Sequence, residues 1–232
     1  MRSMVWYRLA TASAVLLAAC SGDSTNPNGP APDRNDPGSG SSTLLVIANV
    51  DASDVAGGFD TDFDVLVRDA AGSPVSGAVV TISNAGLGTV TLIETPANSG
   101  DYAASRATFS GGDFALTVVR GTDDIRNAVV GGPGVHAITA PVINATVSGQ
   151  QALTVTWTVP STAKSAELET RDFGPTAMQD IGSFQIPVAS NATRPDQRIR
   201  VFRFNEVDLA GGLTGSRLRV KIRQTVEPVI VQ

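Results

Sequence analysis

The alternation of apolar and polar residues that begins at Thr43 constrains this chain more than any other feature. The stretch "DFDVLVRD" from Asp62 puts Phe63, Val65 and Val67 on one side of an extended chain and most of its charges on the other. "DFALTVVRG", "LTVTWTVP" and "SRLRVKIR" repeat this pattern. A period of two predicts strands with one buried face, and Gly, Pro, Asn, Asp and Ser clusters separate them. We therefore expect an all-β fold.

The spacing of these runs predicts two tandem β-sandwiches. The first is expected over residues 43–139 and the second over residues 140–232, with the division near Ala140-Pro141. Several short strands at near-regular spacing in about 95 residues are typical of a sandwich. One large jelly-roll is the alternative architecture.

The first nineteen residues have the features of a secretory signal peptide. Arg2 and Arg8 supply positive charge, and Leu9 to Ala19 form a short apolar segment. A bilayer span needs about 20 apolar residues, whereas a signal core has about 7–15. Residues 1–19 are therefore predicted to be removed from the mature chain.

Cys20, the only cysteine, follows this segment directly. Leu17-Ala18-Ala19-Cys20 resembles the lipobox of bacterial lipoproteins. The resemblance implies that Cys20 receives a diacylglyceryl thioether and that its new amine is acylated, by chains such as palmitate. More than one acyl chain gives stable anchoring. Ser21, where Asp would favour the inner membrane, points to the outer membrane. The alternative is an ordinary secretory signal with a cysteine near the cut.

Residues 20–42 are predicted to comprise the lipidated cysteine and a flexible linker after it. They are almost all Ser, Gly, Asn, Asp, Pro and Thr, which cannot bury enough apolar surface to become ordered. As a random coil, such a linker would span about 25–30 Å.

The first sandwich resembles two families of surface modules over residues 61–121. Gly77-Ala78, Gly100-Asp101-Tyr102 and the run from Gly112 to Val118 are similar to turns and strands of carboxypeptidase-regulatory-like domains. The spacing also resembles bacterial Ig-like domains of the intimin/invasin type. Both families are chiefly stalks, spacers or binding modules, so the resemblance implies such a role.

The second sandwich resembles a fibronectin type III domain over residues 141–225. A strand with a central Trp157 and a terminal Pro160 is similar to the second strand of that family, and Trp157 shares its parity with core residues. In the later run "RIRVFRFN", Ile199 and Val201 oppose the two phenylalanines in parity. A β-bulge near Phe202 would reconcile them.

The charge of the mature chain excludes broad classes of partner. Loss of Arg2 and Arg8 leaves 15 basic against 22 acidic residues, a net charge of −7. General binding to nucleic acid or to an anionic membrane surface favours cations, so neither is expected. With one cysteine, no disulfide within the chain is possible.

One basic stripe stands out against this acidic background. Leu218, Val220 and Ile222 share one parity, so the cations between them face solvent. These cations are Arg217, Arg219, Lys221 and Arg223. They form a candidate face for an anionic ligand, such as a glycan or protein of the envelope. The alternative is that they protect an exposed strand from edge-to-edge association, with Glu167 and Glu169 as cross-strand partners.

No catalytic, metal or cofactor site is predicted. The spacing of Asp60, Asp62 and Asp64 matches the first positions of a calcium-binding loop. Val65 and Ala71 stand where that loop needs Gly and Glu, so the three aspartates are better explained as the solvent face of a strand. His136, the only histidine, is expected in the hinge between the sandwiches, and no G-x-S-x-G motif accompanies it. We expect a non-catalytic binding, adhesion or scaffolding lipoprotein. The alternatives are a spacer without a ligand and a carboxylate-dependent hydrolase.

Overall fold

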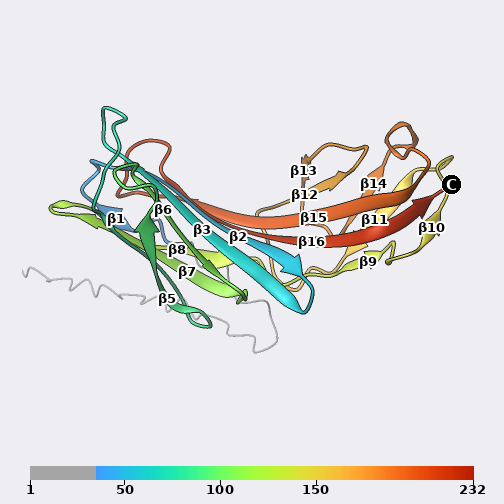
Figure 1. Ribbon diagram of the computed structural model, residues 1–232, viewed down its shortest axis with the longest axis horizontal. Coiled ribbons are helices and arrows are strands. Elements are labelled where there is room, and N and C mark those ends of the chain that lie inside the picture. The colour runs from blue at the N-terminus through green and yellow to red at the C-terminus, as the bar shows by residue number, and fades with distance from the viewer. Residues whose placement is uncertain (1–34) are drawn as a thin grey trace, which may run out of the picture.

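The computed structural model describes residues 35–232 and confirms an all-β fold. The predicted signal peptide, Cys20 and the first part of the predicted linker lie outside the described residues. Two lobes lie side by side, and a long hairpin of β15 (Arg194–Asp208) and β16 (Arg217–Val231) runs through both (Figure 1). Within residues 35–232, no helix is long and apolar enough to cross a bilayer.

The N-terminal lobe is a sandwich of two layers. One layer has the order β1-β8-β7-β4, and the other has the order β6-β3-β2-β16. Strand β5 connects them, because its first part pairs with β4 and its last two residues pair with β6. The strands are β1 (Ser39–Gly40), β2 (Leu45–Val55), β3 (Gly58–Arg68), β4 (Val79–Asn84), β5 (Gly88–Glu94), β6 (Asp101–Arg106), β7 (Gly112–Arg120) and β8 (Asp123–Gly132).

The C-terminal lobe is a fibronectin type III-like sandwich. The sheet β14-β11-β9 packs against β13-β12-β15-β16, and Trp157 packs in the core between them, as predicted. Strand β10 pairs in parallel with the end of β16. The strands are β9 (Ile138–Ala140), β10 (Thr146–Val147), β11 (Leu153–Trp157), β12 (Ser165–Thr170), β13 (Thr176–Met178) and β14 (Ser183–Ile186), with a 3₁₀ turn at Val188–Ser190.

The hairpin supplies residues to both hydrophobic cores, so the expected boundary near residue 140 does not divide the fold cleanly. Val201 and Val229 pack in the core of the C-terminal lobe, whereas Val207, Leu218 and Val220 pack in the core of the N-terminal lobe. Strand β16 also pairs in parallel with β2 along seven residues. Each hairpin strand has 15 residues, which at about 3.4 Å per residue is long enough to reach through both lobes.

The bulge expected near Phe202 is absent. Residues Ile199 to Asp208 of β15 pair with β16 without interruption. The inward parity continues from Val201 through Arg203 and Asn205, which are buried polar residues, and Phe202 faces the other side. The conflict in parity therefore arises because polar side chains face inward between the two cores.

The predicted linker becomes ordered earlier than expected. Residues 39–40 form β1 along β8, and Asp36 pairs with Val129. The prediction of a flexible linker up to residue 42 is therefore wrong for residues 35–42, because the unpaired edge of β8 offers backbone hydrogen bonds that composition does not reveal.

Candidate functional site

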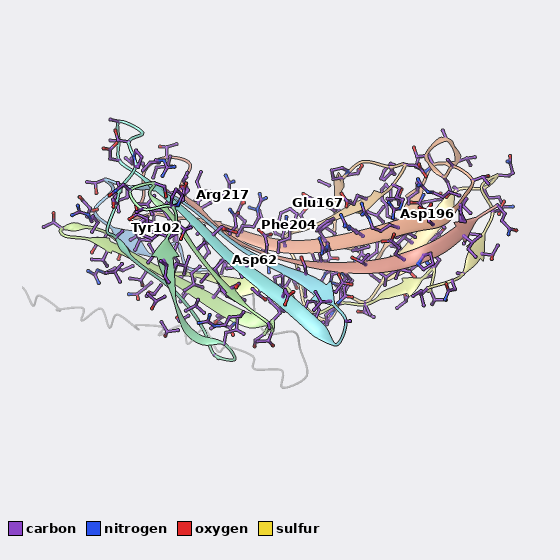
Figure 2. All side chains as sticks on the ribbon, viewed as in Figure 1. Asp62, Tyr102, Glu167, Asp196, Phe204 and Arg217 are labelled. Atoms are coloured by element: carbon purple, nitrogen blue, oxygen red, sulfur yellow. The ribbon has the colours of Figure 1, made fainter. Side chains whose placement is uncertain are left out.

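The outer side of the sheet β12-β15-β16-β2-β3 forms the open face, a name used below for this surface. It lies along the concave side of the arched molecule, where Figure 2 labels Glu167, Phe204, Arg217 and Asp62. The opposite side of the same strands covers the two hydrophobic cores. The open face contains the predicted basic stripe and the predicted acidic residues of β3.

Two cations of the basic stripe share one carboxylate. Arg219 Nη2 lies 2.7 Å from Glu206 Oε2, and Arg217 Nε lies 3.5 Å from the same oxygen. The Arg219 guanidinium also lies 4.9 Å from the centre of the Phe204 ring, which is a cation–π distance. Phe204 lies on the open face, where neighbouring side chains leave it only 8% exposed.

The other two cations of the stripe bind aspartates of β2. Lys221 Nζ lies 3.3 Å from Asp51 Oδ1 and 5.4 Å from the centre of the Phe202 ring. Arg223 Nε lies 3.9 Å from Asp54 Oδ1. All four cations of the stripe thus have carboxylate partners, and an anionic ligand would have to compete with them.

The position of β16 rules out edge protection as the reason for the stripe. Strand β16 lies between β2 and β15, so its backbone is paired on both sides. The expected partner Glu169 binds β15 instead, with Oε1 lying 2.8 Å from Arg200 Nη1 and 4.0 Å from Arg198 Nη2. The stripe belongs to a network of ion pairs across the middle of a sheet.

The acidic residues of β3 differ from this network. Asp60, Asp62 and Asp64 lie exposed on one side of the strand, as the sequence predicted. Within the part of the chain that the structure describes, no basic side chain pairs with any of the three, and no group of His, Cys, Asp and Glu could hold a metal ion. Partial burial, with Asp62 and Asp51 nearby, raises the pKa of Asp64. The unmatched charge on the open face is therefore negative.

A shallow depression of about 370 Å³ lies beside Asp64. Ile47, Leu66 and Ala103 give it apolar walls, and Asn49 contributes an amide. It could receive a small side chain or sugar edge.

A second polar cluster, the waist, lies between the two cores. It consists of residues 131–136 and 161–164 together with Trp157, Asp180, Arg203 and Asn205. Arg203 has a fully buried side chain, and its Nη2 lies 2.6 Å from Asp180 Oδ2, which is also buried. The Trp157 indole donates to the other oxygen of Asp180 at 2.9 Å.

The same guanidinium also holds the connecting segments. Arg203 Nη1 donates to the Gly134 carbonyl at 3.0 Å, and Nη2 donates to the Ser161 carbonyl. Asn205 donates to the Gly131 carbonyl at 2.7 Å and accepts from Lys164 N at 2.6 Å. Strand β15 therefore holds two segments: the one that enters the C-terminal lobe and the connection between β11 and β12.

His136 lies in the connecting segment, as predicted, but it is buried. Its Nε2 lies 3.1 Å from the Val201 carbonyl, and its Nδ1 has no partner among the described residues. Burial and the nearby Arg203 charge lower the pKa of His136 to about 4. The imidazole is therefore neutral at pH 7, and it is not available to a substrate.

The comparisons with known proteins do not assign a family. No protein-family model and no curated protein sequence matches the chain. Fibronectin(III)-like modules of Clostridium thermocellum CbhA match at 18% identity and a TM-score of 0.27, covering 77% of this chain and 92% of that one. The Yersinia pseudotuberculosis adhesin InvE matches at 17% identity and a TM-score of 0.26, covering 80% of this chain and 60% of that one.

A two-domain fibronectin type III segment of chicken tenascin matches at 12% identity and a TM-score of 0.24, covering 77% of this chain and 97% of that one. At these TM-scores the superpositions decide nothing about function, and the fold rests on the strand pairing described above.

Sequence reasoning missed the waist. Arg203 and Asn205 share the parity of the apolar residues Ile199 and Val201, which is the one signal that marks them as inward-facing. Asp180 lies in a loop without periodicity, so no sequence pattern identifies it as the partner of Arg203.

Proposed function

We propose that this chain is a non-catalytic binding or scaffolding module of the bacterial cell envelope, anchored in the outer membrane through a lipid on Cys20. The lipobox resemblance supports the anchor. The shared hairpin is the observation that carries the scaffolding role, because two sandwiches with common strands hold a fixed relation to each other. The waist reinforces that relation with buried hydrogen bonds between β15 and the connecting segments.

The chemistry of the titratable groups supports a non-catalytic role. The His136 ring is buried and hydrogen-bonded to backbone, so it cannot act as a base toward a bound substrate. Asp180 is occupied by Arg203 and Trp157. The acidic residues of β3 lie in a row on one strand, whereas a carboxylate-dependent hydrolase needs two acids on opposite sides of the bond it cleaves.

The open face is the candidate surface for a partner, and the basic stripe remains our candidate for an anionic envelope glycan or protein. An anion there competes with Glu206, Asp51 and Asp54 for the same cations. Its binding should therefore weaken as salt is raised, because exposed charges are screened.

Capture of purified envelope glycans tests the stripe directly. A variant with Arg217, Arg219, Lys221 and Arg223 changed to Ser should lose capture, and a variant with Asp60, Asp62 and Asp64 changed to Asn is the matched control on the same face. Equal capture by the stripe variant and the wild type would remove the stripe from consideration. Loss of capture only in the aspartate variant would assign the binding to the acidic row instead.

The anchor has its own test. Intact-mass analysis of the chain purified from a membrane fraction should show a mature form that begins at Cys20 and carries acyl chains. Cys20→Ser should move the protein to the soluble fraction. A wild-type chain in the membrane fraction with an unmodified Cys20 would contradict the proposal.

A further inference from the structure

The first described residues are fixed along the outer strand of the N-terminal lobe. The backbone groups of Asp36 and Val129 exchange two hydrogen bonds of 2.9 and 2.7 Å. Ser39 then pairs with Arg126 in an antiparallel ladder. Residues 35–42 are therefore part of the folded body, and the point where the tether meets that body is defined by the structure.

That point lies at the waist. The side-chain oxygen of Asn35 accepts a hydrogen bond of 3.4 Å from Gly131 N, and the carbonyl of Gly131 accepts from Asn205. From there the chain runs away from the C-terminal lobe, until Ser42 N donates to the Gly211 carbonyl in the β15–β16 turn. The chain thus enters the body between the lobes and proceeds to the outer end of the N-terminal lobe.

Close packing keeps this segment in place. A Cβ atom added to Gly40 would lie 2.2 Å from the Asp124 carbonyl oxygen and 2.7 Å from the Gly211 carbonyl oxygen, so only glycine fits. Thr43 Oγ1 donates to Asp123 Oδ1 at 2.8 Å, which fixes the far end of the segment. The attachment point at the waist is therefore a property of the fold.

We propose that the lipid anchor holds the body at its waist, so that its two ends lie at similar distances from the lipid surface. This inference rests on the lipid anchor proposed above. Residues between Cys20 and Asn35 can span at most about 50 Å when fully extended. A stalk requires attachment at one end of an elongated body, so attachment between the lobes argues against the spacer alternative.

Energy transfer to a lipid-soluble acceptor in vesicles can measure this orientation. A lipidated Cys20 has no free thiol, so a single introduced cysteine can be labelled alone. Thr214 lies exposed in the β15–β16 turn, at the outer end of the N-terminal lobe, and Gln150 lies exposed beside the C-terminus at the other end. We expect Thr214→Cys and Gln150→Cys, each labelled with the same donor dye, to show similar transfer.

Strong energy transfer from the dye at one end, with only background transfer from the other, would overturn the inference without affecting the proposed lipid anchor. Cys20 found unmodified by mass would instead overturn the anchor, and the inference with it. Labelled chains with Cys20→Ser give the background for both sites.

Gly40→Val provides an internal test of the attachment point. Its side chain should displace β1 from β8 and move the effective attachment toward Thr43, at the outer end of the N-terminal lobe. Transfer from the Thr214 site should then rise relative to the Gln150 site. An unchanged ratio, with residues 35–42 shown by hydrogen exchange to be released, would contradict the proposed role of this segment.

Discussion

The waist and the basic stripe use the same kinds of side chains in opposite surroundings. Arg203 and Asp180 in the waist have side chains that are 0% and 2% exposed, whereas Arg219 and Glu206 in the stripe are 31% and 17% exposed. Water screens the stripe, and it does not reach the waist. The comparison teaches that the conspicuous charges of the sequence are the weaker interactions, and that a single arginine inside β15 matters more for the architecture.

The largest effect should come from breaking the buried pair. Arg203→Met leaves the Asp180 carboxylate buried without its cation, and we expect a loss of about 3–5 kcal/mol in the free energy of unfolding. Urea titration followed by circular dichroism measures this loss. Adding Asp180→Leu should recover part of it, because the unpaired charge is then removed. If Arg203→Met lowered the free energy of unfolding by less than the stripe variants do, the proposed difference between the waist and the stripe would be wrong.

Acid should weaken the waist. The pKa of His136 is lowered from 6.5 to about 4, so its stabilising contribution is complete above pH 6.5 and is lost as the pH falls toward 4. The free energy of unfolding should fall by about 3 kcal/mol in total, because between these pH values the imidazole is protonated in the unfolded chain and stays neutral in the folded protein. Unfolding measured between pH 7 and pH 4 should show this slope in the wild type.

Arg203, Asp180 and Asp54 are the charged groups that act on His136. Replacing His136 by a residue that does not titrate separates the effect of the imidazole from the effects of these neighbouring groups. His136→Gln should flatten the slope between pH 6.5 and pH 4, and an equal slope in both proteins would assign the acid sensitivity to carboxylates elsewhere.

A smaller effect should follow loss of the indole donor. Trp157→Phe keeps an aromatic ring in the core but removes the N–H that donates to Asp180. We expect a destabilisation of about 1–3 kcal/mol, the cost of an unsatisfied buried acceptor. Calorimetry of the variant against the wild type measures it, and an unchanged melting temperature would show that Asp180 does not depend on this bond.

The stripe should give the smallest effect. A double-mutant cycle of Arg219→Ser and Glu206→Gln should yield a coupling energy of about 0–1 kcal/mol, as for other partly exposed ion pairs. The cation–π contact with Phe204 adds about 0.5–1 kcal/mol to the Arg219 single variant at an exposed site. A coupling energy as large as that of the waist would show that the open face is covered in solution.

The sequence allowed the strands to be predicted because their alternation is local. The Trp157 strand, the exposed side of β3 and the inward residues of β16 all follow from a period of two. The shared hairpin could not be predicted in this way. Strand β16 runs through both lobes, and in the N-terminal lobe it pairs in parallel with β2, which comes from the other end of the chain.

The candidate surfaces were predictable only in part for the same reason. Solvent-facing cations on β16 follow from parity, but their partners Asp51, Asp54 and Glu206 lie on two other strands. Parity alone cannot identify those neighbours. It also could not show that β16 lies in the middle of its sheet. From the sequence alone, the cations of the stripe were therefore expected to be available to a ligand, although carboxylates pair with them.

The central claim is that two sandwiches unfold as one unit because they share β15, β16 and the waist. Trp157 is the only tryptophan among residues 20–232 and reports on the C-terminal lobe, while circular dichroism reports on both lobes. Urea unfolding followed by tryptophan fluorescence and by circular dichroism should give one coincident transition in the wild type. Two separate transitions, with the fluorescence change confined to one of them, would contradict the account.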